Sequence, residues 1–126
     1  MIAITPQMRV MAAIDPVDGR KGIDGLSQVC RSVLKMSPMN GTIFAFRNRS
    51  AKSIRLLMYD GQGFWLAIKR LSTNKFNHWP RSPTDEAGAW LLAHQFRALL
   101  FGGDPATGWV APMWRPVTLE GELRPS

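Results

Sequence analysis

Three runs in the middle of the chain alternate apolar and polar side chains: Thr42–Arg49, Ser53–Tyr59 and Phe64–Arg70. A period of two residues is typical of β-strands, because successive side chains of a strand point to opposite faces of the sheet. Taking every second residue assigns one set to a buried face: Phe44, Phe46, Ile54, Leu56, Met58, Phe64, Leu66 and Ile68. The other face would carry a mixed basic and aromatic set: Arg47, Arg49, Arg55, Leu57, Tyr59, Trp65, Ala67 and Lys69.

The segments between these runs have the composition of turns. Asp60-Gly61 lies between the second and third runs, and Asp-Gly supplies the positive φ angles of a tight hairpin. The stretch from Asn48 to Ser53 is polar enough to be the preceding turn. The sequence therefore predicts a three-stranded antiparallel meander over residues 42–70.

One strand and one helix are predicted before the meander. Met8–Ile14 alternates as a strand does. Beyond a break at residues 15–19, apolar residues recur every three or four positions, as on one side of an amphipathic helix: Leu26, Val29, Cys30, Val33 and Leu34. Either Asp18 or Asp24 is a suitable cap for this helix. We expect the helix to pack on the sheet face that carries Phe44, Leu56 and Leu66.

A second helix is predicted after the meander. Thr84 is a suitable N-cap, Asp85 and Glu86 suit the first turn, and Gly102-Gly103 ends the segment. Its apolar positions are Ala89, Leu92, Phe96, Leu99 and Leu100. Prolines after residue 103 disfavour further regular elements. The sequence thus predicts an α+β fold with a small antiparallel sheet, in which residues 1–103 form one domain and residues 104–126 an irregular Pro-rich tail.

Composition fits one folded domain. The 126 residues are 45% hydrophobic, which is enough for one core. The N-terminus lacks the pattern of a signal peptide, and no apolar run reaches the length of a membrane span. Cys30 is the single cysteine, so no internal disulfide is possible, and a small buried thiol is its ordinary role. We expect a cytoplasmic protein with no membrane contact.

Charge is the feature that points to a partner. The formal net charge is +7, and 13 of the 16 Lys and Arg residues lie in residues 1–81 together with only 4 of the 9 acids. A surface with cations and aromatic rings suits nucleic acid. The predicted nucleic-acid contacts are Arg20, Lys21, Arg47, Arg49, Lys52, Arg55, Lys69, Arg70 and Lys75, and the possible stacking residues are Tyr59 and Trp65. Two alternatives stay open: a helix covers the basic face, or Arg20 and Lys21 are a solvated pair before a helix.

Catalysis is the weaker interpretation of the acidic residues. Asp15, Asp18, Asp24 and Asp60 are the carboxylates available for a two-metal site, but each also occupies a turn or cap position. His78, His94 and Cys30 do not have the spacing of a zinc site. We therefore predict no catalytic residues, no metal and no cofactor.

Four motifs in order carry a resemblance to a known family. They are residues 15–26 (DPVDGRKGIDGL), 40–49 (NGTIFAFRNR), 59–65 (YDGQGFW) and 69–71 (KRL), followed by Phe76 and Trp79-Pro80. Over residues 8–103 the chain resembles the TnpB accessory proteins of insertion-sequence family sixty-six, the Orf2-like product of the second open reading frame. The resemblance implies a role beside a separate transposase of the same element, with no chemistry of its own.

The expected function is that of a non-enzymatic accessory protein for DNA transposition. In the leading hypothesis it binds DNA, at element ends or nonspecifically, through the basic surface. In the alternative it is an adaptor that docks on the transposase without touching DNA. Trp109, Met113 and Trp114 in the tail would then be the anchors, or would fold back over the edge of the domain.

Overall fold

The chain forms a mixed sheet with a helix on either side. The computed structural model describes residues 8–81 and 85–103. Within them the elements are, in order, β1 (Val10–Ala13), α1 (Ile23–Ser32), β2 (Ile43–Arg47), β3 (Ser53–Tyr59), β4 (Phe64–Arg70), β5 (Gly88–Leu91) and α2 (Ala93–Leu100). The α+β class is confirmed, with one strand more than the sequence indicates. The predicted tail, residues 104–126, lies outside the described residues.

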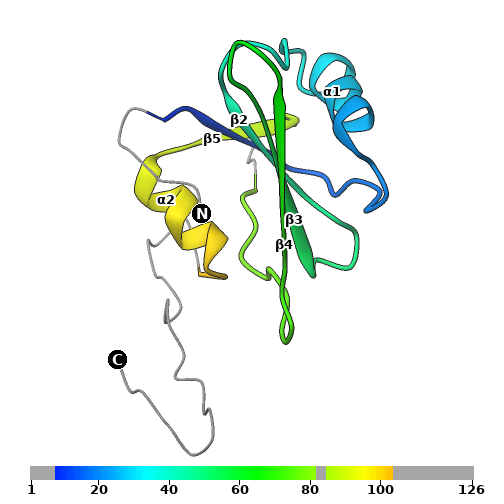
Figure 1. The fold of residues 1–126 in the computed structure, drawn as a ribbon. Coiled ribbons are helices and arrows are strands. Elements are labelled where there is room, and N and C mark those ends of the chain that lie inside the picture. The colour runs from blue at the N-terminus through cyan, green and yellow to red at the C-terminus, as the bar shows by residue number, and fades with distance from the viewer. Residues whose placement is uncertain (1–7, 82–84, 104–126) are drawn as a thin grey trace, which may run out of the picture.

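The first strand lies inside the sheet, whose strand order is β4-β3-β2-β1-β5. β1 runs parallel to β2, with Val10 opposite Ile43, and antiparallel to β5, with Val10 also opposite Leu91. Parallel neighbours need a crossover connection, and α1 lies on the connection from β1 to β2. Figure 1 shows α1 and α2 on opposite sides of the sheet.

The predicted meander is confirmed. β2 pairs antiparallel with β3, and β3 pairs antiparallel with β4 over its full length, from Ser53 opposite Arg70 to Tyr59 opposite Phe64. Asp60 shapes the second turn, since its Oδ1 accepts hydrogen bonds from the backbone N–H groups of Gln62 (2.9 Å) and Gly63 (3.0 Å). Gly61 has a φ of +99°, which explains the glycine there.

The predicted sorting of side chains by face is wrong for the middle strand. Phe44 lies opposite Leu57, and Leu57 lies opposite Leu66, so these three residues share one face. Leu56 lies on the other face with Ala45 and Ala67. Each turn places an even number of residues between the paired strand ends, so even-numbered positions of β2 and β4 match odd-numbered positions of β3. Ile54, Leu56 and Met58 therefore face away from Phe44 and Phe46.

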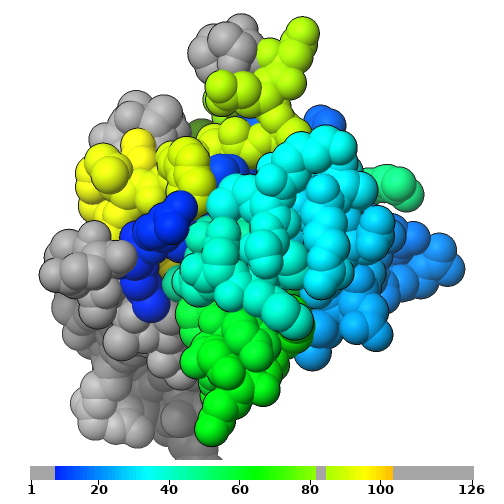
Figure 2. Space-filling view, turned by 90° about the horizontal axis from the view of Figure 1, so that it is seen from above, coloured from blue at the N-terminus to red at the C-terminus, as the bar shows by residue number. Residues whose placement is uncertain are grey.

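Both faces of the sheet are buried. On the α1 face, the buried residues are Met11, Ala13, Val17, Leu26, Cys30, Phe44, Phe46 and Leu57. On the α2 face, they are Val10, Ala12, Ile43, Ala45, Ile54, Leu56, Phe76, Trp79, Leu91, Phe96 and Leu99. α1 packs against Phe44 and Leu66 as predicted, but Leu56 belongs to the opposite side. Figure 2 shows α1 and the segment after it, in light blue to cyan, covering one side beside the green β3–β4 turn.

Residues 88–91 form a strand and not the first part of the second helix. β5 completes the sheet by pairing with the open edge of β1, with Trp90 opposite Met11. α2 starts at Ala93, and the Gln95 side chain accepts a hydrogen bond from the backbone N–H of Leu92 at 2.8 Å. Strand pairing outweighs the local helical pattern because β1 otherwise leaves a row of backbone groups unpaired. The predicted cap, Thr84, lies outside the described residues.

Neither predicted cap of the first helix is correct. Gly22 is the N-cap of α1 and makes no side-chain cap, while Asp24 lies inside the first turn. Asp18 instead belongs to the turn before the helix, where it binds Arg20. Neither described helix, α1 or α2, is long and apolar enough to cross a membrane.

Candidate nucleic-acid interface

The turn between β2 and β3 is held by one side chain. The amide oxygen of Asn48 accepts hydrogen bonds from the backbone N–H groups of Lys52 (3.0 Å) and Ser53 (3.1 Å). Ala51, with a φ of +60°, closes the turn by donating to the Asn48 carbonyl at 3.0 Å. Because these bonds fix the backbone, Arg49 and Lys52 project from a rigid turn and not from a loose loop.

Two other segments pack beside this turn. The segment before α1 joins it through a bridge between Val17 and Asn48, and Val17 N–H donates to the Arg47 carbonyl at 2.8 Å. The segment after β4 joins it through bonds from Leu71 N–H to the Lys52 carbonyl (2.8 Å) and from Phe76 N–H to the Ala51 carbonyl (2.7 Å). One end of the sheet thus gathers three segments that are distant in sequence.

These segments carry five of the predicted cations on one surface. Arg20, Arg49, Lys52, Arg70 and Lys75 are all exposed, and we call these five residues the basic end. Lys21, another predicted contact, is half-buried in the turn just before α1. Residues 48–53 and 70–76 contain no acid, and the ion pair found here within the described residues is that of Asp18 with Arg20. Such a surface attracts polyanions.

Arg20 is the one member of the basic end that has an acidic partner within the described residues. Its guanidinium lies 3.0 Å from a carboxylate oxygen of Asp18, and its backbone N–H donates to the same side chain at 2.9 Å. These two bonds, with weaker attraction from Arg49, hold the pKa of Asp18 well below its ordinary value. The Arg20 side chain is nevertheless 91% exposed, so it keeps free donors for a second partner.

Three other predicted contacts are engaged inside the protein. The guanidinium of Arg47 lies 5.3 Å from the centre of the Trp79 ring and donates to the Phe76 carbonyl at 3.5 Å. Burial lowers the pKa of Arg47, and repulsion from Arg81 adds to the effect. Arg55 donates to the Gly19 carbonyl, which ties β3 to the segment before α1. Lys69 is the third of these contacts. Arg47, Arg55 and Lys69 are all half-buried.

Lys69 is adjacent to Arg70 of the basic end but points to the opposite face of β4, toward α2. Its Nζ donates to the Leu100 carbonyl at 2.6 Å and lies 4.7 Å from the centre of the Phe101 ring. Burial lowers the pKa of Lys69. The charge of Lys69 stabilises the C-terminal end of α2, because unpaired carbonyl groups and the helix dipole favour a cation there.

The predicted stacking residues lie at the opposite end of the β3–β4 hairpin from the basic end. Tyr59 and Phe64 form the strand pair next to the turn, with ring centres 5.0 Å apart, whereas Arg70 pairs with Ser53 at the far end. Seven residues of strand separate the two ends by about 20 Å. Tyr59 donates to the Gly61 carbonyl at 3.3 Å, and Trp65 is 63% exposed. The structure therefore does not bring Tyr59 and Trp65 together with the basic end.

The acidic side chains of the turns have partners of their own. Asp60 accepts a hydrogen bond from the Trp65 indole N–H at 2.7 Å besides the two backbone bonds of its turn. The pKa of Asp60 is held below its ordinary value by three hydrogen bonds: first that from the Gln62 N–H, then that from the Trp65 indole and that from the Gly63 N–H.

Among the described residues there is no cluster of three His, Cys, Asp or Glu side chains that could hold a metal ion. Burial raises the pKa of the Cys30 thiol to about 12.

Two exposed arginines outside the predicted contacts, Arg81 and Arg9, lie beside tryptophan-bearing segments. Arg81 is near enough to Arg47 to lower its pKa, and Arg9 lies 4.8 Å from the centre of the Trp90 ring. Arg81 follows Trp79-Pro80, and the Trp79 indole is anchored by a 2.7 Å hydrogen bond to the Ala13 carbonyl. The position of Arg81 next to that motif is the only sequence signal that points to it.

Comparison with known proteins gives one family and two relatives. A model of the family described as IS66 Orf2 like protein matches residues 8–107, a range that includes every described residue. The uncharacterized protein y4jC of Sinorhizobium fredii (strain NBRC 101917 / NGR234) is 32% identical over 117 residues, or 93% of this chain and 94% of the relative. The uncharacterized protein y4hO of the same strain is 35% identical over 119 residues, or 92% and 96%. No solved structure matches the chain.

Proposed function

We propose, from the premise that this chain belongs to the family of IS66 Orf2-like proteins, that it serves transposition by binding DNA through the basic end. The match of the family model to residues 8–107 confirms the resemblance that the four sequence motifs indicated. Family membership supports the accessory role in transposition, and the DNA contact is the step that we add. The observation that carries it is the convergence of five exposed cations from three segments on one rigid end of the sheet.

The basic end suits the phosphate backbone better than the bases. Arg49 and Lys52 project from a turn, and neither has an acidic partner among the described residues. Arginine and lysine bind phosphate oxygens through charge, and arginine adds bidentate geometry. No aromatic side chain of the predicted stacking pair lies at this end. Backbone contacts give affinity and orientation but little sequence discrimination, so we expect element ends and other duplexes to be bound through the same surface.

A salt titration tests this mechanism. Fluorescence anisotropy would measure the affinity for a labelled duplex of the element end between low and physiological salt. The double variant Arg49→Gln with Lys52→Gln should bind more weakly at every salt concentration. The slope of log affinity against log salt should also fall by about 1 per cation removed, or about 2 for the pair.

The matched control removes two charges elsewhere. Arg31 lies in the last turn of α1, Lys35 lies three residues beyond the helix, and both are exposed. Arg31→Gln with Lys35→Gln therefore has the same net charge as the test variant. It should keep most of the affinity and the salt slope. Absence of binding at low salt, or an equal loss in both double variants, would contradict the proposal. A scrambled duplex of the same length would measure specificity for the element end.

The proposal assigns no reaction to the chain. Asp18 and Asp60, two of the four candidate carboxylates, already bind Arg20 and the β3–β4 turn. Incubation of the purified protein with Mg²⁺ and supercoiled plasmid checks this point. Nicking that disappears in Asp60→Asn would overturn the non-enzymatic role.

The transposase of the same element is the proposed protein partner. The adaptor alternative places its contact in the tail, at Trp109, Met113 and Trp114, outside the described residues. Copurification of transposase with the full chain, and with a variant in which these three residues are alanine, distinguishes the alternatives. An adaptor would lose transposase in the variant and would show no DNA binding of its own.

A further inference from the structure

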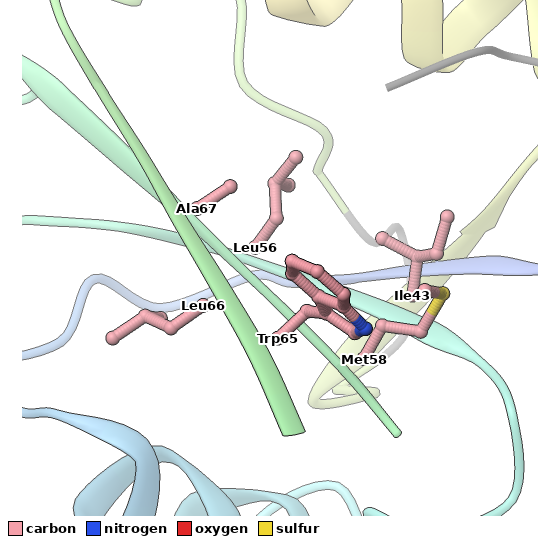
Figure 3. Close-up of a pocket in the computed structure, with 6 residues that line it drawn as sticks. All are labelled: Ile43, Leu56, Met58, Trp65, Leu66 and Ala67. Carbon is pink, nitrogen blue, oxygen red and sulfur yellow. The ribbon is translucent and has the colours of Figure 1, made fainter. Parts of the chain in front are cut away.

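An apolar pocket of about 130 Å³ opens on the α2 face beside the edge strand β4 (Figure 3). It is lined on this face by Ile43, Leu56, Met58, Trp65 and Ala67, and also by Leu66, whose side chain packs on the α1 side. None of these side chains is charged, and only the Trp65 indole carries a polar atom. Sites for drug-sized ligands measure about 300–1,000 Å³, so this pocket has room for one side chain and not for a cofactor.

Trp65 forms one wall of the pocket and is the most conspicuous exposed apolar residue near it. Its ring is 63% exposed, and the 2.7 Å bond from the indole N–H to Asp60 fixes its orientation. Figure 3 shows the Trp65 ring reaching across the face toward Met58 and Ile43. A tryptophan held rigidly with its ring exposed is typical of a surface that receives another apolar group.

Helix α2 ends close to strand β4, which forms one side of this pocket. Gly102 N–H donates to the Leu99 carbonyl (3.1 Å) and Gly103 N–H to the Ala98 carbonyl (2.7 Å), the bond pattern of a Schellman motif. Lys69 ties the same helix end to β4, on the face that also carries Ala67 and Trp65. From Lys69 to Trp65 the strand extends only about 13 Å.

The tail has the reach and the anchor to fill the pocket. Trp109 is the first aromatic residue after Gly103. The six residues from 104 to 109 span up to about 20 Å when extended, which exceeds the distance along β4. The alignment with y4jC extends over 117 residues, more than the 103 that precede the tail, so part of the tail has a counterpart in that relative.

We propose that Trp109 of the same chain occupies this pocket and packs against Trp65 and Met58. The proposal does not depend on DNA binding, since none of the residues that line the pocket belongs to the basic end. It gives the tail a fixed place on the α2 face, next to the helix from which it emerges.

Nuclear magnetic resonance of the full chain tests the contact directly. The Trp109 ring should show nuclear Overhauser effects to the Met58 methyl group, with the indole signal assigned from Trp109→Phe. Trp109→Ala should shift the signals of the Met58 methyl and the Trp65 indole. Trp114→Ala is the matched control, and it should leave both signals in place.

A second variant changes a residue that lines the pocket instead of Trp109. Met58→Lys places a charge in the pocket and should return the Trp109 indole to the chemical shift of an exposed tryptophan. Ile68→Lys, on the neighbouring strand and the opposite face, should leave Trp109 unchanged. The proposal is overturned by absence of the Overhauser effects, by unchanged Met58 and Trp65 signals in Trp109→Ala, or by isotope filtering that assigns the contact to a second molecule.

Discussion

Lys69 in β4 and Leu100 at the end of α2 are joined by a hydrogen bond of 2.6 Å from the ammonium group to the carbonyl oxygen. The bond satisfies a carbonyl that has no partner within the helix, at the end where the helix dipole favours a cation. The Phe101 ring lies 4.7 Å from the same ammonium. Lys69 therefore fastens α2 to the edge strand, although its sequence context indicates a DNA contact.

Lys69→Met tests this structural role. Methionine keeps most of the apolar stem and removes the charged donor, so the free energy of unfolding should fall by about 1 kcal/mol. Urea denaturation followed by circular dichroism measures the change. Arg70→Met, at the exposed next position, should stay within about 0.5 kcal/mol of the parent. Equal losses in the two variants would refute the assignment.

The burial of both sheet faces predicts the effect of truncating neighbouring leucines. Leu56 is 6% exposed and Leu57 is fully buried, on opposite faces of β3. Each of Leu56→Ala and Leu57→Ala should lower the free energy of unfolding by about 2–4 kcal/mol, because each leaves a cavity in a separate core. Ile68→Ala, at a 53% exposed position, should cost less than about 1 kcal/mol. A mild effect of Leu57→Ala would mean that the α1 face is open.

Two glycines of one turn should respond differently to the same substitution. Gly61 has a φ of +99°, where a side chain is strained, whereas Gly63 has no such angle and has open space around its Cα. Gly61→Ala should lower the free energy of unfolding by about 1 kcal/mol, and Gly63→Ala should leave it nearly unchanged or slightly raised. Thermal unfolding of the two variants side by side gives the comparison. The reverse order would show that the turn has another geometry.

The bond between Trp65 and Asp60 should be visible in a titration. The pKa of Asp60 is held below its ordinary value of 3.8 by the Gln62 N–H, the Trp65 indole and the Gly63 N–H. Trp65→Phe removes the second of these, so the pKa should rise toward 3.8 and remain below it. Carbon-13 resonance of the carboxyl group measures the change. Trp90→Phe is the control and should not move it.

The same shift sets the sign of the pH dependence of stability. A carboxyl whose pKa is lower in the folded state than in the unfolded state stabilises the fold above the unfolded value of 3.8. That contribution is lost as the pH falls through the folded pKa. Stability measured from pH 5 downward should therefore decline less steeply in Trp65→Phe. An identical decline in both proteins would show that the indole bond does not contribute.

Local signals were sufficient for the strands and turns of the meander. The ranges of β3 and β4 agree with the alternation of their side chains, and Asp60-Gly61 forms the turn that its composition predicts. The face of each strand was not predictable in the same way, because it depends on how many residues each turn places between paired positions. The alternation alone groups Leu56 with Phe44, whereas the lengths of the two turns place Leu57 there.

Burial was the other property that the sequence did not provide. The prediction of nine basic contacts treated all the cations alike, yet Arg47, Arg55 and Lys69 bind carbonyl groups inside the protein. Whether an arginine binds DNA or a carbonyl depends on which distant segment passes beside it. For Arg55 that segment is the turn at Gly19, and no local sequence pattern predicts this contact.

The place of β1 in the sheet has a consequence for synthesis on the ribosome. Val10 pairs with Ile43 on one side and with Leu91 on the other, so its two neighbours are made at very different times. Strands β1 to β4 and helix α1 are complete once Arg70 has left the ribosome. The edge of β1 that pairs with β5 stays unpaired until Leu91 has also emerged. An open strand edge is a template for pairing with another chain. The nascent protein is therefore most exposed to mispairing between the emergence of these two residues.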